Sequence, residues 1–457
     1  MAVSSAAILD RQRDRESAAR SYARHLPIVP VRAEGMTIHG ADGRAYLDCL
    51  SGAGVLALGH NHPVAVAAIR CVLDSGAPLH VLDLATPIKD EFTETLLGVL
   101  PRDLAKDARI HFCGPSGADA VEAAIKLART ATGSTGLIAF TGAYHGMTAG
   151  ALAATGNTTI RTPARVNDAG VTRLPYPQTY RCPYGVGGAE GAHIAAEQLR
   201  RLLNDPGSGL TPPAAVIVEP VQGEGGVIPA PNEWLRTVRE ESAAHGIPLI
   251  ADEVQTGLGR TGELWGVDHA GVTPDVMVLS KAIGGGLPLA VIAYRASLDV
   301  WAEGAHTGTF RGQQLAMAAG TATIRYVMEN DLTTRARKVG AQIRIAFEEA
   351  ARELPAIGEV RGRGLMLGVE LVEPDGAPDS LGARPAAPEL AQAVRGAALS
   401  RGVLVELGGR HGSVLRLLPP LTITDLEAEQ VISVLIDSID DAQARFSAHR
   451  VPAGARS

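Results

Sequence analysis

Three charged residues follow short apolar runs in the middle of the sequence. Glu219 follows the run AAVIV, Asp252 follows PLIA, and Lys281 comes one residue after VMVL. Apolar runs without alternation are typical of parallel strands that are covered by helices on both faces. Open α/β sheets bind their ligands at the carboxyl ends of such strands. We therefore expect these three side chains to lie along one edge of a sheet and to form a site.

The types of these residues indicate imine chemistry on a ring. Lys281 precedes the flexible turn AIGGG, and burial there would lower the pKa of its ammonium group, as an imine-forming lysine needs. The alternative is a lysine that extends to the solvent. Asp252 can keep a pyridine-type nitrogen protonated, so that the ring withdraws electrons. Gln255 can donate to a phenolate-type oxygen on the ring, and Glu253 has no assigned role.

A glycine-containing turn precedes a predicted helix at GPSGAD, residues 114–119. Ser116 and Asp119 resemble a capping box that opens the helix. The exposed N–H groups of a first helical turn, together with the helix dipole, favour an anion. The segment is therefore interpreted either as a phosphate site or as a plain helix cap.

Tyr144 and His145 follow another predicted strand, residues 136–140. Tyr144 can stack on a cofactor ring, or it can make an ordinary hydrophobic contact beside a histidine bound to the backbone. His60 and His62 occupy a loop rich in Gly, Asn and Pro, and we interpret them as loop residues rather than as metal ligands. No metal site is expected.

The composition excludes several classes of protein. The chain has 457 residues, enough for two or three domains, with 46% hydrophobic and 20% charged residues. A net charge of −7 argues against a non-specific nucleic-acid surface. The four cysteines form no CxxC pair, which fits a reducing compartment. Neither a signal peptide nor a long apolar segment is present, so we expect a cytoplasmic protein without a membrane contact.

The pattern of elements predicts an α/β fold with a smaller domain built from both chain ends. Beyond the central strands we expect helices at Asn232–His245, Leu332–Leu354 and Glu389–Arg401, and short strands near Leu365–Glu370 and Val414–Leu418. The expected organisation comprises an N-terminal arm with part of the small domain at 1–60, a large domain at 61–325, and the rest of the small domain at 326–457. Residues 372–386 are predicted to form a surface loop, and the terminal RVPAGARS a frayed tail.

The chain resembles the class III (ω-amino-acid) aminotransferases of fold type I from about residue 16 to about residue 435, and seven segments between residues 114 and 423 carry the resemblance. They occur in the family's order: GPSGADAVEAAIKLAR, AYHGMT, EPVQGEGG, DEVQTGLGRTG, LSKAIGGGLP, HTGTFRGQQLAMAAG and LRLLPPLTI. The resemblance implies a large domain with a mostly parallel seven-stranded sheet, a smaller α/β domain, and pyridoxal 5′-phosphate as the cofactor.

The resemblance also implies roles for individual residues. Lys281 matches the lysine that carries the cofactor as a Schiff base and moves the proton, and Asp252 matches the partner of the ring nitrogen. The other matches contact the ring hydroxyl, the phosphate or the ring face: Gln255, Ser116, Gly117, Ala118, Tyr144 and His145. Thr309 matches a threonine that reaches the phosphate of the other subunit, which implies a homodimer with its active site at the interface.

Arg416 and Glu224 match a pair that lets one pocket accept two kinds of substrate. An arginine binds the α-carboxylate of glutamate through two hydrogen bonds. When an ω-amine occupies the pocket, the same cation needs a glutamate to neutralise it. The alternative for Arg416 is an exposed arginine on a surface strand.

One position departs from the family pattern, because Met147 stands where ornithine and γ-aminobutyrate aminotransferases carry an arginine for the distal carboxylate. AYHGMT, TYRCPYG and HTGTFRG look most similar to enzymes that exchange the 4-amino group of L-2,4-diaminobutyrate with 2-oxoglutarate, and among these to enzymes of siderophore biosynthesis. The expected products are aspartate 4-semialdehyde and glutamate. The alternatives are transamination of ornithine, lysine or 4-aminobutyrate, a dialkylglycine-type decarboxylation, an aminomutase reaction, and a non-catalytic ligand-sensing regulator.

Overall fold

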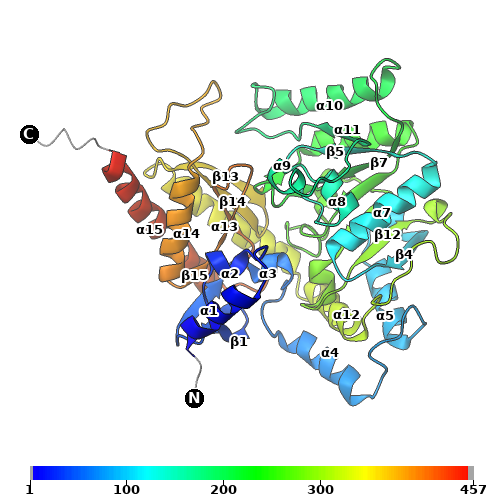
Figure 1. Ribbon diagram of the computed structural model, residues 1–457, viewed down its shortest axis with the longest axis horizontal. Helices are drawn as coiled ribbons and strands as arrows, with labels where there is room; N and C mark the ends of the chain where they lie inside the picture. Colours follow the sequence, from blue (N-terminus) through cyan, green and yellow to red (C-terminus); the bar gives the residue numbers. More distant parts are fainter. Residues whose placement is uncertain (1–3, 451–457) are drawn as a thin grey trace, which may run out of the picture.

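A seven-stranded sheet forms the centre of the larger half of the molecule, in a computed structural model that describes residues 4–450 (Figure 1). Its strand order is β4 (Ala108–Phe112), β12 (Val291–Arg295), β11 (Val276–Leu279), β10 (Leu249–Asp252), β7 (Pro213–Val218), β5 (Gly136–Phe140) and β6 (Val171–Leu174). Only β12 runs antiparallel to its two neighbours. The predicted mostly parallel sheet is confirmed.

Apolar layers on both faces explain why these strands lack alternation. In β10, Ile250 belongs to one buried cluster, whereas Leu249 and Ala251 belong to the other. The first cluster contains residues of α7 (Gly117–Thr132), and the second contains residues of α11 (Asn232–Ala244). Because both faces are covered, ligands approach this sheet at its edge.

The smaller half contains an antiparallel sheet of four strands, β13 (Ile357–Arg363), β14 (Met366–Leu371), β17 (Val414–Leu417) and β16 (Glu406–Gly408). Three long helices accompany it, α13 (Leu332–Ala350), α14 (Pro388–Ser400) and α15 (Asp425–Arg450) (Figure 1). A further sheet joins β1 (Pro30–Glu34), β2 (Thr37–Gly40) and β3 (Ala45–Asp48) to β15 (Val403–Leu404). Segments near the two ends of the chain therefore share one sheet.

Shorter elements complete the fold. The helices are α1 (Ser5–Arg15), α2 (Tyr22–His25), α3 (Ser51–Gly54), α4 (Pro63–Asp74), α5 (Pro87–Leu97), α6 (Arg102–Ala105), α8 (Ala149–Ala154), α9 (Thr158–Arg161), α10 (Gly188–Asn204) and α12 (Gln314–Glu329). A hairpin of β8 (Val221–Gln222) and β9 (Ile228–Pro229) and three 3-10 turns, η1 (Gly266–Ala270), η2 (Lys281–Gly284) and η3 (Ala296–Leu298), make up the rest.

Side chains of the larger half bind the smaller half at two places. Arg260 donates to the carbonyl oxygens of Leu365 and Pro419. Arg181, in the TYRCPYG segment, pairs with Glu370 of β14 and donates to the carbonyl of Arg384 at 2.8 Å. These contacts fix the small sheet against the edge of the large one.

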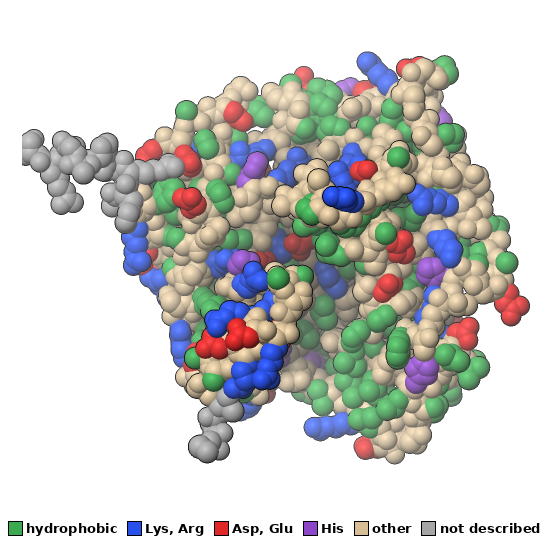
Figure 2. All heavy atoms as spheres, viewed as in Figure 1, with side chains coloured by type: hydrophobic (Ala, Val, Ile, Leu, Met, Phe, Trp, Pro, Cys, Tyr) green, Lys and Arg blue, Asp and Glu red, His purple; other side chains and the backbone are tan. Residues whose placement is uncertain are grey.

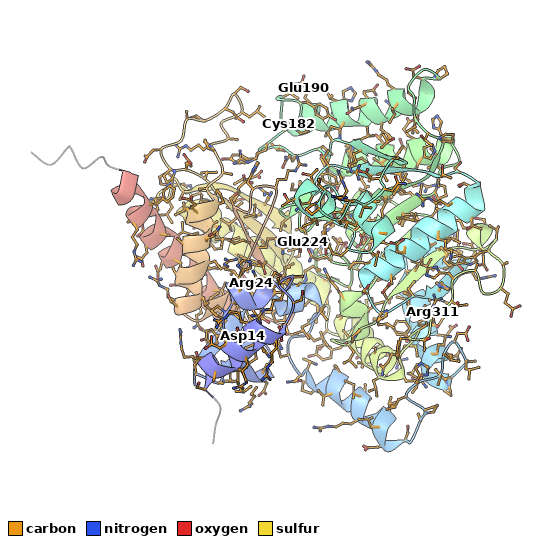
Figure 3. The ribbon with its side chains drawn as sticks, in the orientation of Figure 1. Asp14, Arg24, Cys182, Glu190, Glu224 and Arg311 are labelled. Carbon is orange, nitrogen blue, oxygen red and sulfur yellow. The ribbon has the colours of Figure 1, made fainter. Side chains whose placement is uncertain are left out.

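The face between the two halves is hollowed, with acidic and basic side chains on its floor (Figure 2). Glu224 lies at this position, between the two halves (Figure 3). No helix among residues 4–450 combines the length and the apolar character needed to cross a bilayer. Apart from Arg450, which ends α15, the RVPAGARS segment lies outside the described residues.

Candidate active site

Asp252 and Lys281 occupy the carboxyl ends of neighbouring parallel strands. Asp252 ends β10, and Lys281 begins η2 one residue after the end of β11, whose Val278 is the register partner of Asp252. Burial lowers the pKa of Lys281, and the positive charge of Arg416 acts in the same direction, whereas Glu224 and Asp252 raise it. The lysine is therefore directed into a charged site and not to the solvent.

The backbone around Lys281 is tightly constrained. Lys281 itself has a left-handed φ of 48°. At Gly285, four residues later, φ is 59° and a Cβ atom would lie 2.5 Å from the carbonyl oxygen of Ala319 in α12. The glycine turn lets α12 approach the lysine turn closely, so the packing of α12 fixes the position of Lys281.

His145 is hydrogen-bonded to Asp252, with 2.7 Å between Nδ1 and the carboxylate. Burial alone would lower the pKa of His145, but the hydrogen bond and the negative charge of Asp252 raise it overall. The other carboxylate oxygen of Asp252 accepts the backbone N–H of Val254 at 3.1 Å. His145 thus orients a buried aspartate, while its own Nε2 has no hydrogen-bond partner in the described part of the chain.

Glu219 holds two parts of the site together, a role that the sequence analysis did not assign. Its carboxylate accepts the N–H of Tyr144 at 2.9 Å and the N–H of Gly223 at 3.0 Å. Burial raises the pKa of Glu219 to about 7, an effect that the charge of His145 opposes. The sequence contains one signal for this role: Glu219 directly follows an apolar run, and a charged side chain at a buried strand end needs hydrogen-bond partners.

The first turn of α7 lies beside the other predicted segments. Ser116 caps the helix and forms the predicted capping box with Asp119. A Cβ atom on Gly117 would lie 2.9 Å from Val254, and one on Gly146 would lie 2.5 Å from the Cβ of Ala118. The first turn of α7 is therefore packed closely against the segments that carry Asp252 and Tyr144.

Gln255 connects the site to the N-terminal segment. Its Nε2 donates to the carbonyl of Ala53 at 3.2 Å, and its Oε1 is buried without a partner among the described residues. Ala53 has a left-handed φ of 58°. Glu253, by contrast, is structural, because it accepts N–H groups from Gly266 and Val267 and a hydrogen bond from Thr256.

Arg416 and Glu224 form an ion pair in the site, with 2.6 Å between Nη1 and Oε1. Arg416 is only 1% exposed, which rules out the alternative of a surface arginine. The main chain at Glu224 is fixed at two points, because Gly409 N–H donates to the carbonyl of Glu224 at 2.9 Å and Arg361 Nε donates to that of Gly226 at 2.8 Å.

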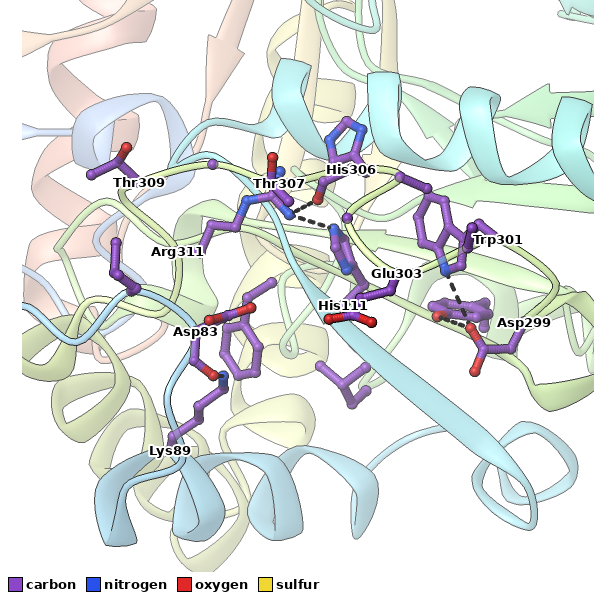
Figure 4. Close-up of a pocket in the computed structure, with 18 of the residues that line it drawn as sticks. Asp83, Lys89, His111, Asp299, Trp301, Glu303, His306, Thr307, Thr309 and Arg311 are labelled. Carbon is purple, nitrogen blue, oxygen red and sulfur yellow. Dashed lines mark hydrogen bonds between the residues drawn. The ribbon is translucent and has the colours of Figure 1, made fainter.

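Thr309 is the predicted site residue that lies apart from the others in this chain. It lies on the loop before α12, beside an open pocket of about 820 Å³ that Arg311 and His111 also line (Figure 4). Its carbonyl oxygen is 3.0 Å from Nε2 of His80.

Two further residues singled out in the sequence have these positions. The side chain of Met147 is 56% exposed, and Nε2 of His60 lies 2.8 Å from the carboxylate of Asp48.

The class III aminotransferase family model matches residues 18–439. The chain therefore belongs to the class III aminotransferases, a family that depends on pyridoxal 5′-phosphate. A diaminobutyrate–2-oxoglutarate aminotransferase of Rhizobium meliloti is 55% identical over 93% of this chain and 91% of its own length. A protein of the same name from Haemophilus influenzae is 48% identical over 95% of both chains.

Solved aminotransferases share the fold. The ornithine aminotransferase of Toxoplasma gondii is 26% identical, with a TM-score of 0.81, and the match covers 97% of this chain and 96% of that one. An amine transaminase from an uncultivated Pseudomonas species, solved with pyridoxal phosphate bound, is 31% identical with a TM-score of 0.82, over 94% and 98% of the two chains. The prediction of a fold type I enzyme is confirmed.

The residues present fit this cofactor. Oε1 of Gln255 and Nε2 of His145 are buried polar atoms without partners in residues 4–450. Gly117 and Gly146 let the segments of Asp252 and Tyr144 approach the N-terminus of α7, a position that favours a phosphate. When bound, the cofactor supplies an aldehyde and an electron-withdrawing ring. Lys281 is the amine that would hold the aldehyde, and Asp252 is the carboxylate that would pair with the ring nitrogen.

Proposed function

We propose that this enzyme transfers the 4-amino group of L-2,4-diaminobutyrate to 2-oxoglutarate, reversibly, giving aspartate 4-semialdehyde and glutamate. The observation that carries the proposal is the Arg416–Glu224 pair beside Lys281. An enzyme that accepts an ω-amine in one half-reaction and an α-amino acid in the other needs a cation that can be neutralised. The names of the two relatives above support the choice of amine.

The residues of the site have separable roles in this reaction. When glutamate binds, the ion pair between Arg416 and Glu224 opens, and Arg416 binds the α-carboxylate of the substrate. While the ω-amine reacts, Glu224 pairs with Arg416 again. Lys281, whose pKa is lowered by burial, carries the proton between the substrate carbon and the cofactor carbon as a general base and acid. Tyr144 covers the ring, with its backbone fixed by Glu219, and the α7 N-terminus with Ser116 holds the phosphate.

The test is a comparison of amine donors with the purified holoenzyme and 2-oxoglutarate. Diaminobutyrate, ornithine, lysine and 4-aminobutyrate are each supplied, and glutamate formation and carbon dioxide release are measured. We expect the highest kcat/KM with diaminobutyrate and no carbon dioxide. A higher kcat/KM with one of the other three amines, or release of carbon dioxide, would assign the chain to a different class III activity.

We also propose a homodimer in which Thr309 reaches the phosphate of the partner subunit. The loop that carries Thr309 exposes large apolar side chains, and neighbouring segments add more, the most exposed being Val300, Phe310, Leu82 and Leu84. Exposed apolar patches of this kind indicate a protein interface. The neighbouring polar pocket remains open in a single chain (Figure 4).

Mixing two inactive variants tests the shared site. In the proposed dimer, each site takes Lys281 from one subunit and Thr309 from the other. A mixed dimer of Lys281→Ala and Thr309→Ala subunits therefore has one site in which both residues are intact. We expect the mixture to regain activity that neither variant has, and sedimentation to give a dimer. No recovery after demonstrated exchange would contradict the proposal.

The four free cysteines support a cytoplasmic location, and resemblance supports a role in making diaminobutyrate for siderophores.

A further inference from the structure

A second carboxylate lies beside Arg416. Glu406 of β16 is directly opposite Arg416 of β17 in the antiparallel register, and directly opposed residues of such a pair project from the same face. Arg416 also crosses Gly408, where a Cβ atom would lie 2.6 Å from its Nε. One guanidinium is therefore flanked by two carboxylates, those of Glu224 and Glu406.

The carboxylate of Glu406 is only partly satisfied. The residue is 9% exposed, and its Oε1 accepts only a 3.2 Å hydrogen bond from the N–H of Leu407. Its Oε2 is buried and has no partner among the described residues, and the same holds for Nε of Arg416. A buried carboxylate oxygen without a donor costs free energy. A donor that the chain itself does not supply is therefore expected at Oε2.

The surroundings place Glu406 on the substrate side of the site. Burial raises the pKa of the Tyr22 phenol. Four neighbouring groups have smaller effects on this pKa and therefore lie within electrostatic range of the phenol: Glu224, Glu406, Arg416 and Tyr144. Tyr22 therefore lies near both the cluster of Glu224, Glu406 and Arg416 and Tyr144, the residue that we propose to cover the ring.

The guanidinium of Arg416 and the carboxylates of Glu224 and Glu406 together carry a net negative charge. Arg416 already pairs with Glu224 at 2.6 Å. Arg395 of α14 also acts on Glu406, but its guanidinium is 3.2 Å from Nδ1 of His25 in α2, outside the pair. Burial raises the pKa of Glu406, and the charge of Arg416 opposes this rise. A small cation next to Oε2 would satisfy both the charge and the hydrogen bond.

We propose that Glu406 determines specificity by accepting the ammonium group at the far end of the ω-amino substrate, which in diaminobutyrate is the α-ammonium. This inference rests on the proposed function. Diaminobutyrate and 4-aminobutyrate differ only by that ammonium group. A site with a buried acceptor discriminates strongly against an analogue that lacks the donor, because the acceptor then stays unpaired.

Glutamate is expected to respond to Glu406 in the opposite direction. Its ammonium group reacts at Lys281 and its α-carboxylate binds Arg416, so its far end carries no ammonium group. The negative charge of Glu406 next to Arg416 therefore weakens the binding of glutamate. The signs of the two effects distinguish a specificity residue from one that only supports the fold.

The experiment measures single half-reactions of the holoenzyme by its absorbance change, with diaminobutyrate, 4-aminobutyrate and glutamate. For Glu406→Gln we expect kcat/KM for diaminobutyrate to fall about 10- to 100-fold, the loss of one charged hydrogen bond. We expect 4-aminobutyrate to react equally well or better, and the KM for glutamate to fall. An equal loss with all three substrates, or no loss with diaminobutyrate, would overturn the proposal.

Two further variants keep the test decisive. Glu406→Asp retains the charge at a shorter reach and should recover part of the preference for diaminobutyrate, and a preference no higher than in Glu406→Gln would count against the proposal. Glu389→Gln changes an exposed acid on α14 and should behave as wild type. If ornithine proves to be the substrate, the proposed function fails, but ornithine compared with 5-aminopentanoate still tests Glu406 through the same missing ammonium group.

Discussion

Nη1 of Arg416 lies 2.6 Å from Oε1 of Glu224, although the two residues come from different parts of the fold and are separated by 192 positions. Arg416 belongs to β17 of the small antiparallel sheet, and Glu224 lies in the turn between β8 and β9. In the proposed reaction, the α-carboxylate of glutamate has to displace Glu224 from this pair, which joins the two halves of the molecule beside Lys281.

Replacing Arg416 by Gln should damage the glutamate half-reaction selectively. The variant loses a charged, two-point contact to the α-carboxylate, so we expect kcat/KM for glutamate to fall about 100-fold. Diaminobutyrate should be affected less, since Glu224 no longer needs to neutralise a cation. Single-turnover absorbance measurements provide both values, with Arg401→Gln, a surface arginine paired to Asp441, as the control. Equal losses in both half-reactions would contradict the assigned role.

The pH dependence of cofactor attachment should move in opposite directions in two variants. Arg416 lowers the pKa of Lys281 and Glu224 raises it, both after the larger lowering by burial. Removing the cation in Arg416→Gln should shift the pH profile for recombination of the apoprotein with pyridoxal phosphate upward, and Glu224→Gln should shift it downward. In Lys281→Ala, borohydride reduction should yield no adduct at residue 281. Identical profiles in the two variants would show that Lys281 does not respond to this pair.

Gly146→Ala should weaken cofactor binding. The added Cβ would lie 2.5 Å from the Cβ of Ala118, in the first turn of α7. Overpacking of this kind costs about 1–3 kcal/mol, so we expect the Kd for pyridoxal phosphate to rise about 10- to 100-fold. Gly133→Ala, at the other end of α7, also has a positive φ but meets nothing within 4 Å. Fluorescence titration should show a normal Kd for that control. A normal Kd for Gly146→Ala as well would show that the contact between Gly146 and the first turn of α7 does not contribute to cofactor binding.

Arg181→Met should loosen the contact between the two halves. Arg181 pairs with Glu370, which keeps Arg361 as a second partner. We therefore expect a loss of about 1–3 kcal/mol in unfolding free energy, measured by urea denaturation of the holoenzyme. Arg344→Met removes an exposed pair with Glu348 and should change the free energy by less than about 0.5 kcal/mol. A loss as small as that of the control would show that Arg181 does not stabilise the contact between the two halves.

Buried Glu253 should make the protein less stable as the pH rises from 4.5 to 7. Burial raises its pKa from 4.5 to about 7, so in this window the folded state binds more protons than the unfolded state, and stability decreases with pH. The shift corresponds to about 3 kcal/mol. In Glu253→Gln the decrease in Tm between pH 5 and pH 7 should become smaller. An unchanged slope would show that this carboxyl group does not titrate in that range.

Much of the site follows from local sequence. The apolar runs before Glu219, Asp252 and Lys281 correspond to β7, β10 and β11, and Ser116 caps α7 as expected. In each case the deciding pattern spans fewer than ten residues, because strand burial and helix capping depend on close neighbours. The expected helices at 332–354 and 389–401 also appear, with ends that differ by a few residues.

Other features depend on contacts between distant segments. The hydrogen bond between His145 and Asp252 joins residues 107 positions apart, and the placement of Glu406 opposite Arg416 depends on the register of β16 and β17. No local pattern encodes either pairing. The role of Glu219 as an acceptor for two N–H groups was missed for the same reason, since both donors come from loops whose path depends on the whole fold.

The hydrogen bonds to the main chain at Glu224 and Gly226 mean that only the side chain of Glu224 has to move in the proposed exchange of partners at Arg416. Since the carbonyls of residues 224 and 226 are both held, the backbone stays in place while the carboxylate turns about its own side-chain bonds. Rotamer changes of this kind take picoseconds to nanoseconds, whereas loop movements extend to microseconds. On the proposed role of Glu224, the exchange of partners at Arg416 therefore avoids the slower movement of a loop.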